Sequence, residues 1–156
     1  MVELEEMTQA ELETWIPPMR AGYVEQRVGA GEERAAAQSN ADSQFEQLFP
    51  GGCPAEGQHV MRVVVDGEAV GSLWMGRPFG GSESTWFVFY VEVDEAHRGK
   101  GFGRVAMQAA EDWTRAHGGS RVALNVFGPN TVARNLYDSL GYQVMATGMF
   151  KDLDGA

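Results

Sequence analysis

A glycine-rich segment that follows a long apolar stretch constrains the fold of this chain more than any other feature. The apolar stretch Thr85–Val93 reads as a buried strand. It leads into Arg98–Gly103 (RGKGFG), after which Gly103–His117 shows the spacing of an amphipathic helix. Such a turn leaves free backbone N–H groups at a helix N-terminus, where the helix dipole also favours negative charge. The segment therefore predicts a phosphate-binding turn in an α/β fold.

Two common phosphate-binding fingerprints do not fit this segment. A dinucleotide fingerprint that starts at Gly99 and Gly101 would need a third glycine at position 104, which is Arg104. A Walker-type loop would need Ser or Thr directly after Gly99-Lys100, where Gly101 stands. The spacing that does fit is R-x-x-G-x-G, with Arg98, Gly101 and Gly103 in the fixed places. A tight turn that needs glycine for its geometry alone remains the alternative.

The first third of the chain predicts a short strand and two helices. Val2 and Leu4 alternate with acidic residues as in a strand. Thr8–Glu11 matches a capping box that starts a helix. That helix should break or kink at Pro17-Pro18, because proline lacks a backbone donor and clashes with the preceding turn. A second helix is expected over Glu32–Leu48.

The rest of the chain predicts a hairpin followed by alternating strands and helices. Asp66-Gly67 is a strong hairpin turn between the apolar runs Val60–Val65 and Ala69–Met75. The alternation indicates a parallel strand pair in the second half, with the strand at 85–93 central and covered on both faces. The later elements are expected to be a helix over Gly103–His117, a strand over Val122–Phe127, a helix from the N-cap Asn130 to Gly141, and a closing strand over Tyr142–Phe150. One domain should span residues 1–156.

Two motifs together resemble the GNAT superfamily of N-acetyltransferases. The R-x-x-G-x-G segment is similar to that family's acyl-CoA pyrophosphate loop, and Val91–Asp94 is similar to the strand end that holds the pantetheine arm. Asn130–Tyr142 (NTVARNLYDSLGY) resembles the family's N-x-x-A-x-x-L-Y-x-x-L-G-F/Y helix. The resemblance is strongest over residues 60–150 and weak over residues 1–59.

The resemblance implies a GNAT fold, in the α/β (α+β) class: a mixed, mostly antiparallel sheet flanked by helices, with strands that splay near Val93 and Asn125. It implies acetyl-CoA as co-substrate, with no metal, and direct transfer of the acetyl group to a primary amine. The residues that it assigns to cofactor binding are Val91, Val93, Arg98, Gly99, Lys100, Gly101, Phe102, Gly103 and Asn130.

The same resemblance assigns two catalytic tasks. Tyr137 is expected to hydrogen-bond the leaving thiolate, and a backbone N–H at a strand bulge in the Glu92–Val93 region is expected to stabilise the oxyanion. The resemblance does not assign the general base that would take a proton from the amine. The positions where relatives carry a titratable residue hold Phe87 and Asn125, which cannot take a proton at neutral pH. Glu92 is the remaining carboxylate on the strand. It can act directly or through water, it can instead pair with Arg98 or Lys100, and an amine of low pKa needs no base.

Composition excludes several classes of function. The formal net charge of −10 argues against nucleic-acid or anionic-membrane binding. Cys53 is the single cysteine, so no disulfide can form within the chain and a reducing, cytoplasmic location is expected. The acidic N-terminus lacks the basic start of a signal peptide. His59 and His117 have no second ligand at metal spacing, so no metal is expected, and His97 is expected to be an exposed turn residue.

The acceptor is the part that the motifs do not determine. It should bind near residues 8–50 and the loop 77–84, and Trp74 and Trp86 are candidates to line its pocket. The charged candidates are Arg20, Arg27 and Arg34 for an anionic acceptor, and Glu25, Glu32 and Glu33 for a cationic one. A small-molecule amine and a protein N-terminal or lysine amine both remain open. Two further possibilities also remain open: that the chain is a non-catalytic module that binds acyl-CoA, and that it forms a homodimer.

Overall fold

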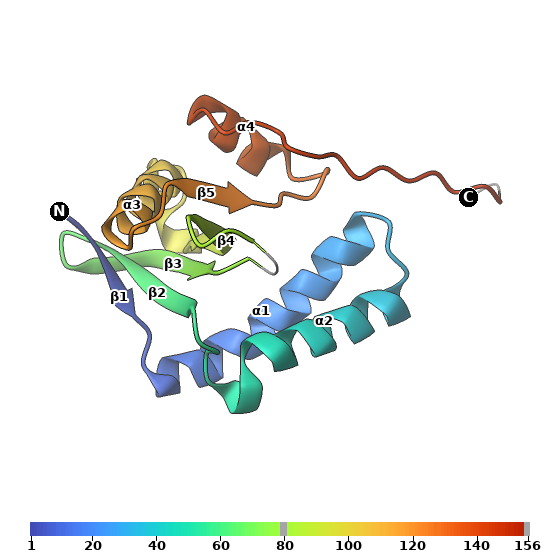
Figure 1. Ribbon diagram of the computed structural model, residues 1–156, viewed down its shortest axis with the longest axis horizontal. Coiled ribbons are helices and arrows are strands. Elements are labelled where there is room, and N and C mark those ends of the chain that lie inside the picture. Colours follow the sequence, from blue (N-terminus) through green and yellow to red (C-terminus); the bar gives the residue numbers. More distant parts are fainter. Residues whose placement is uncertain (79–80, 155–156) are drawn as a thin grey trace.

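The computed structural model describes residues 1–78 and 81–154, which form a five-stranded sheet with helices on both faces. The strand order is β1-β2-β3-β4-β5, antiparallel except for the parallel pair β4–β5 (Figure 1). The strands are β1 Val2–Glu6, β2 Gln58–Val65, β3 Glu68–Gly76, β4 Thr85–Val93 and β5 Arg121–Leu124. The sequence-based expectation of a mixed, mostly antiparallel sheet with a parallel pair in the second half is confirmed.

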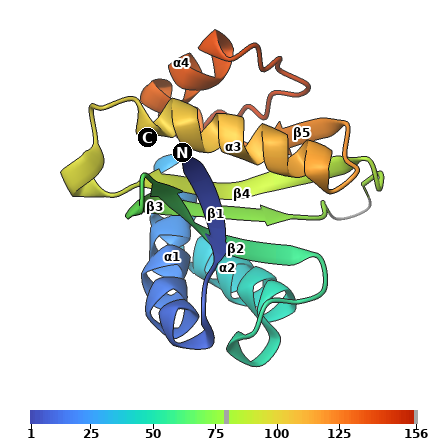
Figure 2. The same cartoon turned by 90° about the vertical axis from the view of Figure 1, so that its left-hand side faces the viewer.

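Four α-helices and two 3-10 turns cover the described part of the sheet. Figure 2 shows α1 and α2 below the sheet and α3 above it. Their bounds are α1 Gln9–Gly29, α2 Arg34–Leu48, α3 Phe102–Ala116 and α4 Thr131–Ser139, with short 3-10 turns at Pro50–Gly52 and Glu95–His97. Among the described residues, no helix is long and apolar enough to cross a membrane.

Helix α1 continues through Pro17 and Pro18, so the expected break is wrong. Buried side chains on both sides of the prolines, among them Leu12, Ile16 and Met19, pack against the same apolar cluster beneath the sheet. This packing holds both halves of the helix against the sheet. It outweighs the two backbone hydrogen bonds that prolines cannot make, because most helix stability in proteins comes from packing.

The hairpin at Asp66-Gly67 forms as expected, with φ of 50° and 84° at these two residues. It joins β2 to β3, and β3 is the middle strand, buried from Val70 to Gly76. Strand β4 was expected to be central but lies next to the edge strand β5. Its second half is only half-buried, because β5 is short and pairs with β4 only as far as Val88.

The closing strand expected over Tyr142–Phe150 does not form in the described chain. Residues 142–154, which we call the C-terminal tail, have no assigned strand. The expected strand over Val122–Phe127 also ends early, at Leu124. Apolar residues are present in the tail, but a strand forms only by pairing with a neighbouring strand, and no backbone hydrogen bond joins residues 143–154 to another segment of the described chain.

The capping box at the start of α1 is present as predicted. The backbone N–H of Thr8 donates to Glu11 Oε2 at 2.7 Å, and the N–H of Glu11 donates to Thr8 Oγ1 at 3.3 Å. We expect Thr8→Ala to lower the free energy of unfolding by about 1 kcal/mol, because one orphan amide loses its acceptor. Urea unfolding followed by circular dichroism measures this. Thr14→Ala, on the exposed surface of the same helix, is the control and should change stability by less than half as much.

Candidate active site

The site begins where β4 separates from β5. Parallel pairing ends at Val88 opposite Leu124, so backbone groups of residues 89–93 that point toward β5 have no strand partner. Figure 1 shows β4 and β5 with α3 and α4 close to their edge. This open edge agrees with the expected separation of the two strands near Val93 and Asn125. A ligand with an extended amide-containing arm can pair with such an edge as a strand would.

The bulge in β4 lies at Phe89, not in the Glu92–Val93 region where it was expected. Trp74 pairs with Tyr90 and Met75 pairs with Val88, which leaves Phe89 as the extra residue. Because of this extra residue, Phe89 and Tyr90 both lie against the cluster beneath the sheet, and Phe89 stacks on Trp74 with ring centroids 4.7 Å apart. The extra residue of a bulge is left unpaired in the ladder, and Phe89 follows directly on Val88, where the pairing of β4 with β5 ends.

The turn after β4 leaves the N-terminus of α3 uncapped. Gly99 and Gly101 have φ of 75° and 81°, a left-handed conformation that glycine adopts without strain. A Cβ at either position would meet nothing within 4 Å, so both glycines border open space. The helix begins at Phe102 with Gly101 as N-cap and no side chain bonded to its first amides. The amides of the first turn are thus available to an anion.

Two basic residues flank these amides in different ways. Arg98 is tied back to the strand: its Nε donates to the Val93 carbonyl at 3.0 Å and its Nη2 lies 3.4 Å from Glu92 Oε1. Lys100 is exposed at the tip of the turn and has no ion-pair partner among residues 1–78 and 81–154. Arg98 therefore shapes the turn, while Lys100 presents its charge to solvent.

Helix α4 packs against Gly103 at the start of α3 and is capped by Asn130, and both are predicted cofactor residues. A Cβ on Gly103 would lie 3.3 Å from Leu136 Cδ2, so the missing side chain lets α4 approach closely. Asn130 Oδ1 accepts a hydrogen bond from the Ala133 N–H at 3.2 Å and caps α4. The oxygen of Asn130 thus already has a structural partner.

A cleft of about 440 Å³ opens between the splayed strands and helices α1 and α2. Val91, Asn125 and Tyr137 line it, which places the end of β4, the segment after β5 and α4 around one space. Its remaining wall is largely aromatic, contributed by Tyr23, Phe45, Trp74, Phe87, Phe89 and Tyr90. We call this space the inner cleft. Its size and apolar lining suit a small ligand.

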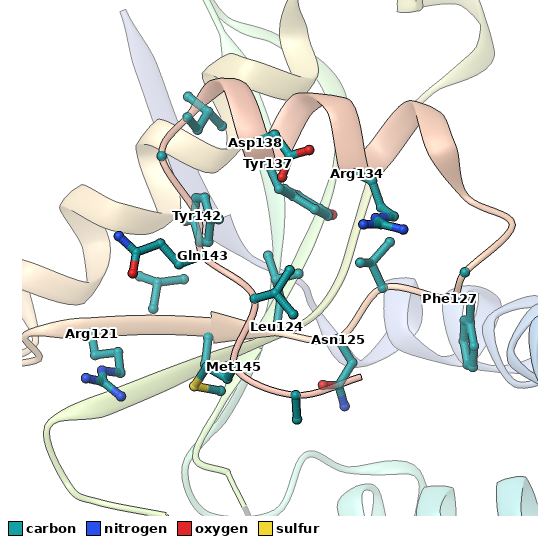
Figure 3. A pocket seen from close by; sticks show the side chains of 18 of the residues that line it. Arg121, Leu124, Asn125, Phe127, Arg134, Tyr137, Asp138, Tyr142, Gln143 and Met145 are labelled. Atoms are coloured by element: carbon teal, nitrogen blue, oxygen red, sulfur yellow. The ribbon is translucent and has the colours of Figure 1, made fainter. Parts of the chain in front are cut away.

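Tyr137 projects from α4 and is half-buried (Figure 3). Burial raises the pKa of its phenol above the usual value near 10. The hydroxyl is therefore protonated at neutral pH and is a hydrogen-bond donor, and no partner for it is found among the described residues. A protonated phenol beside the open edge of β4 can donate to a group that gains negative charge there.

Glu92 lies at the end of β4 but does not line the inner cleft. Its carboxylate faces Arg98, which is the pairing that the sequence left open as an alternative to a catalytic role. Phe87 and Asn125, at the positions where relatives carry titratable residues, do line the cleft. Among the described lining residues of the cleft there is no carboxylate and no histidine.

The charged residues proposed for acceptor binding largely neutralise one another. Arg27 pairs with Glu32 and also donates to the Tyr23 hydroxyl, and Arg34 pairs with Glu25 at 2.6 Å. Of these, Arg27 lines the inner cleft. In the loop 77–84, Pro78 lines the cleft, while residues 79 and 80 lie outside the described residues.

The tryptophans and histidines separate into cleft and core positions. Trp74 lines the inner cleft as expected, whereas Trp86 packs on the other face against Trp113, with ring centroids 4.7 Å apart. His97, expected to be an exposed turn residue, packs against Phe102, and 17% of its side chain is exposed. Within the described ranges, no group of three or more His, Cys, Asp or Glu side chains is arranged to hold a metal ion.

The aromatic lining of the inner cleft was not predicted from the sequence, Trp74 and Phe87 excepted. Tyr23 comes from α1 and Phe45 from α2, and they meet with ring centroids 6.1 Å apart. Their buried positions at helical spacing resemble those of ordinary core residues. Nothing local in the sequence distinguishes an aromatic residue at the rim of a cleft from one inside the core.

Alkaline pH should destabilise the protein through Tyr90. Burial, with a smaller contribution from the nearby Glu92 carboxylate, raises the pKa of Tyr90 to about 12. The unfolded value is near ~10, so the stabilising contribution of the protonated phenol is complete below about pH 10 and is lost as the pH rises toward 12. We expect the thermal midpoint to fall less steeply between pH 10 and 12 in Tyr90→Phe than in the unmodified protein. Equal slopes would contradict this.

Comparison with known proteins places this geometry in a family. Residues 20–142 match the sequence pattern of the acetyltransferase (GNAT) family. The uncharacterized N-acetyltransferase YdgE of Bacillus subtilis (strain 168) is 28% identical over 152 residues, 96% of this chain and 97% of that protein.

Solved structures agree with this assignment. The crystal structure of YycN from Bacillus subtilis, an uncharacterized N-acetyltransferase, has a TM-score of 0.88 at 27% identity and covers 98% of this chain and 99% of that one. AAC(6')-Iy in complex with the bisubstrate analogue CoA-S-monomethyl-acetylneamine has a TM-score of 0.57 at 18% identity, a likeness of fold, and covers 98% of both chains. Because the family match spans most of the sequence and the fold agrees along its whole length, the chain belongs to the GNAT family of acetyltransferases.

Proposed function

We propose that this protein transfers an acetyl group from acetyl-CoA to the amine of a small molecule that binds in the inner cleft. One observation carries the proposal: the open edge of β4 lines the inner cleft together with Tyr137 and continues along the chain into the turn before the uncapped N-terminus of α3. A phosphate-bearing cofactor with an extended arm and a reactive end matches that order of groups. The CoA analogue bound by the fold neighbour AAC(6')-Iy is consistent with it.

In this proposal the pyrophosphate lies on the free amides of residues 99–104, and Lys100 adds a positive charge at the tip. The pantetheine arm pairs with the open edge of β4 between the bulge at Phe89 and Val93. Gly103 keeps α4 close to this edge. The thioester then reaches the inner cleft beside Val91 and Tyr137.

The chemistry is a direct acyl transfer. The lone pair of a neutral amine attacks the thioester carbonyl carbon, a C–N bond forms, and negative charge develops on the carbonyl oxygen. Backbone amides next to the bulge at Phe89 stabilise that oxygen, a kind of contribution worth about 3–4 kcal/mol in comparable sites. The C–S bond then breaks, the thiolate leaves with a hydrogen bond from the Tyr137 hydroxyl, and the amine nitrogen gives up its proton to water.

Glu92 should not be needed as the base, because it faces Arg98 and does not line the cleft. We expect Glu92→Gln to change kcat by no more than about twofold, whereas removal of a general base lowers it by about 10² or more. Asp94→Asn, a change of the same kind two residues along the chain, is the control. A large loss of kcat in Glu92→Gln alone, with its pH profile flattened on the acid side, would establish Glu92 as the base after all.

The acceptor that suits the inner cleft is a small amine with an apolar or aromatic body. The wall is aromatic, the volume is about 440 Å³, and Arg27 is already paired with Glu32. Curated relatives that match part of this chain are named mycothiol acetyltransferase and streptothricin acetyltransferase, which both act on small-molecule amines by name.

A screen of acceptors tests the proposed function. Small aromatic amines, polyamines, aminoglycosides, amino acids and peptides are each incubated with acetyl-CoA, and release of free CoA is followed with a thiol reagent. The Cys53→Ser variant removes the exposed thiol that would add background. Turnover with a small amine supports the proposal. Acetyl-CoA binding without turnover on any amine would favour a non-catalytic acyl-CoA-binding module, and turnover on peptides alone would favour a protein acetyltransferase.

A further inference from the structure

Arg27 is the single charged side chain among the described residues that line the inner cleft. It lies in the last turns of α1, one turn after Tyr23. The Tyr23 ring packs against Phe127 with centroids 6.4 Å apart, so this end of α1 lies beside the segment that follows β5 (Figure 1). With no carboxylate or histidine in the described lining, Arg27 determines the charge of the cleft wall.

Contacts with neighbouring side chains fix the orientation of the Arg27 guanidinium. Its Nε donates to Glu32 Oε2, and its Nη1 donates to the Tyr23 hydroxyl at 2.8 Å. Glu32 is held in turn, because Asn40 Nδ2 donates to its Oε1 at 2.6 Å and its own N–H donates to the Arg27 carbonyl at 3.0 Å. A ligand at Arg27 therefore meets a side chain that has already lost its rotamer freedom, which favours tight binding.

One nitrogen of this guanidinium has no hydrogen-bond partner within residues 1–78 and 81–154. It is Arg27 Nη2, which carries two N–H groups. The Glu32 carboxylate is not part of the cleft lining, whereas Arg27 is, and 26% of the Arg27 side chain is exposed. Donors in a planar, fixed arrangement of this kind suit a carboxylate, which accepts short charge-assisted hydrogen bonds from them.

An amide lines the same part of the cleft. Gln44 is half-buried on α2, and its side chain makes no hydrogen bond with the described residues. It directly precedes Phe45, whose ring centroid lies 6.1 Å from that of Tyr23, so Gln44 lies near the turns of α1 that carry Tyr23 and Arg27. An amide can donate and accept hydrogen bonds. The cleft thus offers a fixed cation and a free amide beside an otherwise largely aromatic wall.

We propose that the acceptor is an amine with an aromatic body and a carboxylate, in the simplest case an aromatic amino acid, and that Arg27 binds this carboxylate through Nη2. The inference rests on the proposed acetyl transfer in the inner cleft and names the class of amine. The ring of the acceptor packs among the rings of the wall, where Phe89 is stacked on Trp74. Arg34 does not share this role, because both of its Nη atoms donate to Glu25 and it does not line the cleft.

A carboxylate bound at Arg27 also favours the reactive form of the amine. An ammonium next to a free carboxylate keeps its proton more tightly, because the opposite charge stabilises the charged form. Pairing with Arg27 neutralises the carboxylate and removes that stabilisation, so the pKa of the bound amine falls. The neutral amine that attacks the thioester then forms without a basic side chain. This agrees with a cleft in which none of the described lining residues is a carboxylate or a histidine.

A pair of acceptors tests whether Arg27 selects for the carboxylate. The kcat/KM for acetylation of free phenylalanine should exceed that for phenethylamine, which lacks only the carboxylate, by about tenfold or more. In Arg27→Gln the ratio of the two kcat/KM values should fall by about tenfold or more. Glu32→Gln is the matched control, because it breaks the same ion pair but leaves the guanidinium bonded to Tyr23, and it should keep the ratio. Equal loss of the ratio in both variants, or no preference in the unmodified protein, would overturn the proposal.

Binding of 3-phenylpropanoate separates this inference from the proposed function, because this carboxylate has no amine and its binding needs no turnover. Titration into the protein saturated with CoA should show binding that Arg27→Gln weakens by about tenfold or more and Glu32→Gln keeps. The neutral 3-phenylpropanol should bind both variants alike. This result without acetylation of any amine would keep the carboxylate site but overturn the acetyl transfer, and with it the acceptor. Acetylation of phenethylamine with no effect of Arg27→Gln in either assay would keep the acetyl transfer and overturn the carboxylate site.

Discussion

Replacing Gly101 by valine is expected to weaken acetyl-CoA binding by about 5- to 150-fold. Gly101 has φ of 81° and is the N-cap of α3, with open space where a side chain would project. A β-branched residue in this conformation costs on the order of 1–3 kcal/mol, which corresponds to that range of affinity if the turn relaxes. The added methyl groups also occupy the space through which a pyrophosphate approaches the amides. Equilibrium dialysis against radiolabelled acetyl-CoA measures the change.

Gly118→Val is the matched control for this substitution. Gly118 lies just beyond the other end of α3, has φ of 75° and also has nothing within 4 Å of its Cβ position. Both substitutions should therefore lower the thermal midpoint by similar amounts. Gly118→Val should keep the affinity for acetyl-CoA. If both variants bind alike, the turn at residues 99–103 is not the pyrophosphate site.

Replacing Tyr137 by phenylalanine is expected to lower kcat by about 10²-fold or more while leaving the affinity for acetyl-CoA unchanged. The hydroxyl is the protonated donor next to the open edge of β4, and its removal leaves the departing thiolate without a hydrogen bond. The ring remains, so packing against the core is kept. Steady-state kinetics with the acceptor found in the screen, together with dialysis for acetyl-CoA, separates the two effects.

Tyr142→Phe removes the same group from a neighbouring ring. The ring centroids of Tyr137 and Tyr142 lie 5.8 Å apart, and the Tyr142 hydroxyl donates to Glu111 Oε1 at 3.2 Å. This variant should lose some stability, because a half-buried hydrogen bond is removed, but it should keep kcat within about threefold. Equal losses of kcat in both variants would show that the effect is structural and that Tyr137 has no special role in the reaction.

The sequence was most informative where local chemistry decides the structure. The hairpin at Asp66-Gly67 and the uncapped turn at Arg98–Gly103 formed where they were predicted, because positive φ and free amides depend on a few adjacent residues. The Asn130 cap also formed as predicted. The two motifs predict the cofactor side of the candidate site from the same kind of local chemistry.

The sequence was least informative where contacts between distant segments determine the local structure. The prolines at 17 and 18 do not end α1, because packing on the sheet holds both halves of the helix. The bulge at Phe89 arises in the pairing of β4 with β3 and places Phe89 against Trp74, a residue of that other strand. Residues 142–150 are rich in apolar residues, yet they pair with no other strand within the described chain. The composition of a segment shows that it can pair but does not show with what.

Isothermal titration of the folded protein with acetyl-CoA tests most directly whether the turn at Arg98–Gly103 and the open edge of β4 form an acyl-CoA site. ATP and NADH, which share the adenosine and pyrophosphate but lack the pantetheine arm, are the controls. We expect saturable binding of acetyl-CoA with one site per chain and at least tenfold weaker binding of both controls. Protein that unfolds cooperatively on heating and yet gives no binding heat with acetyl-CoA, at any of several temperatures, would contradict the assignment of this site.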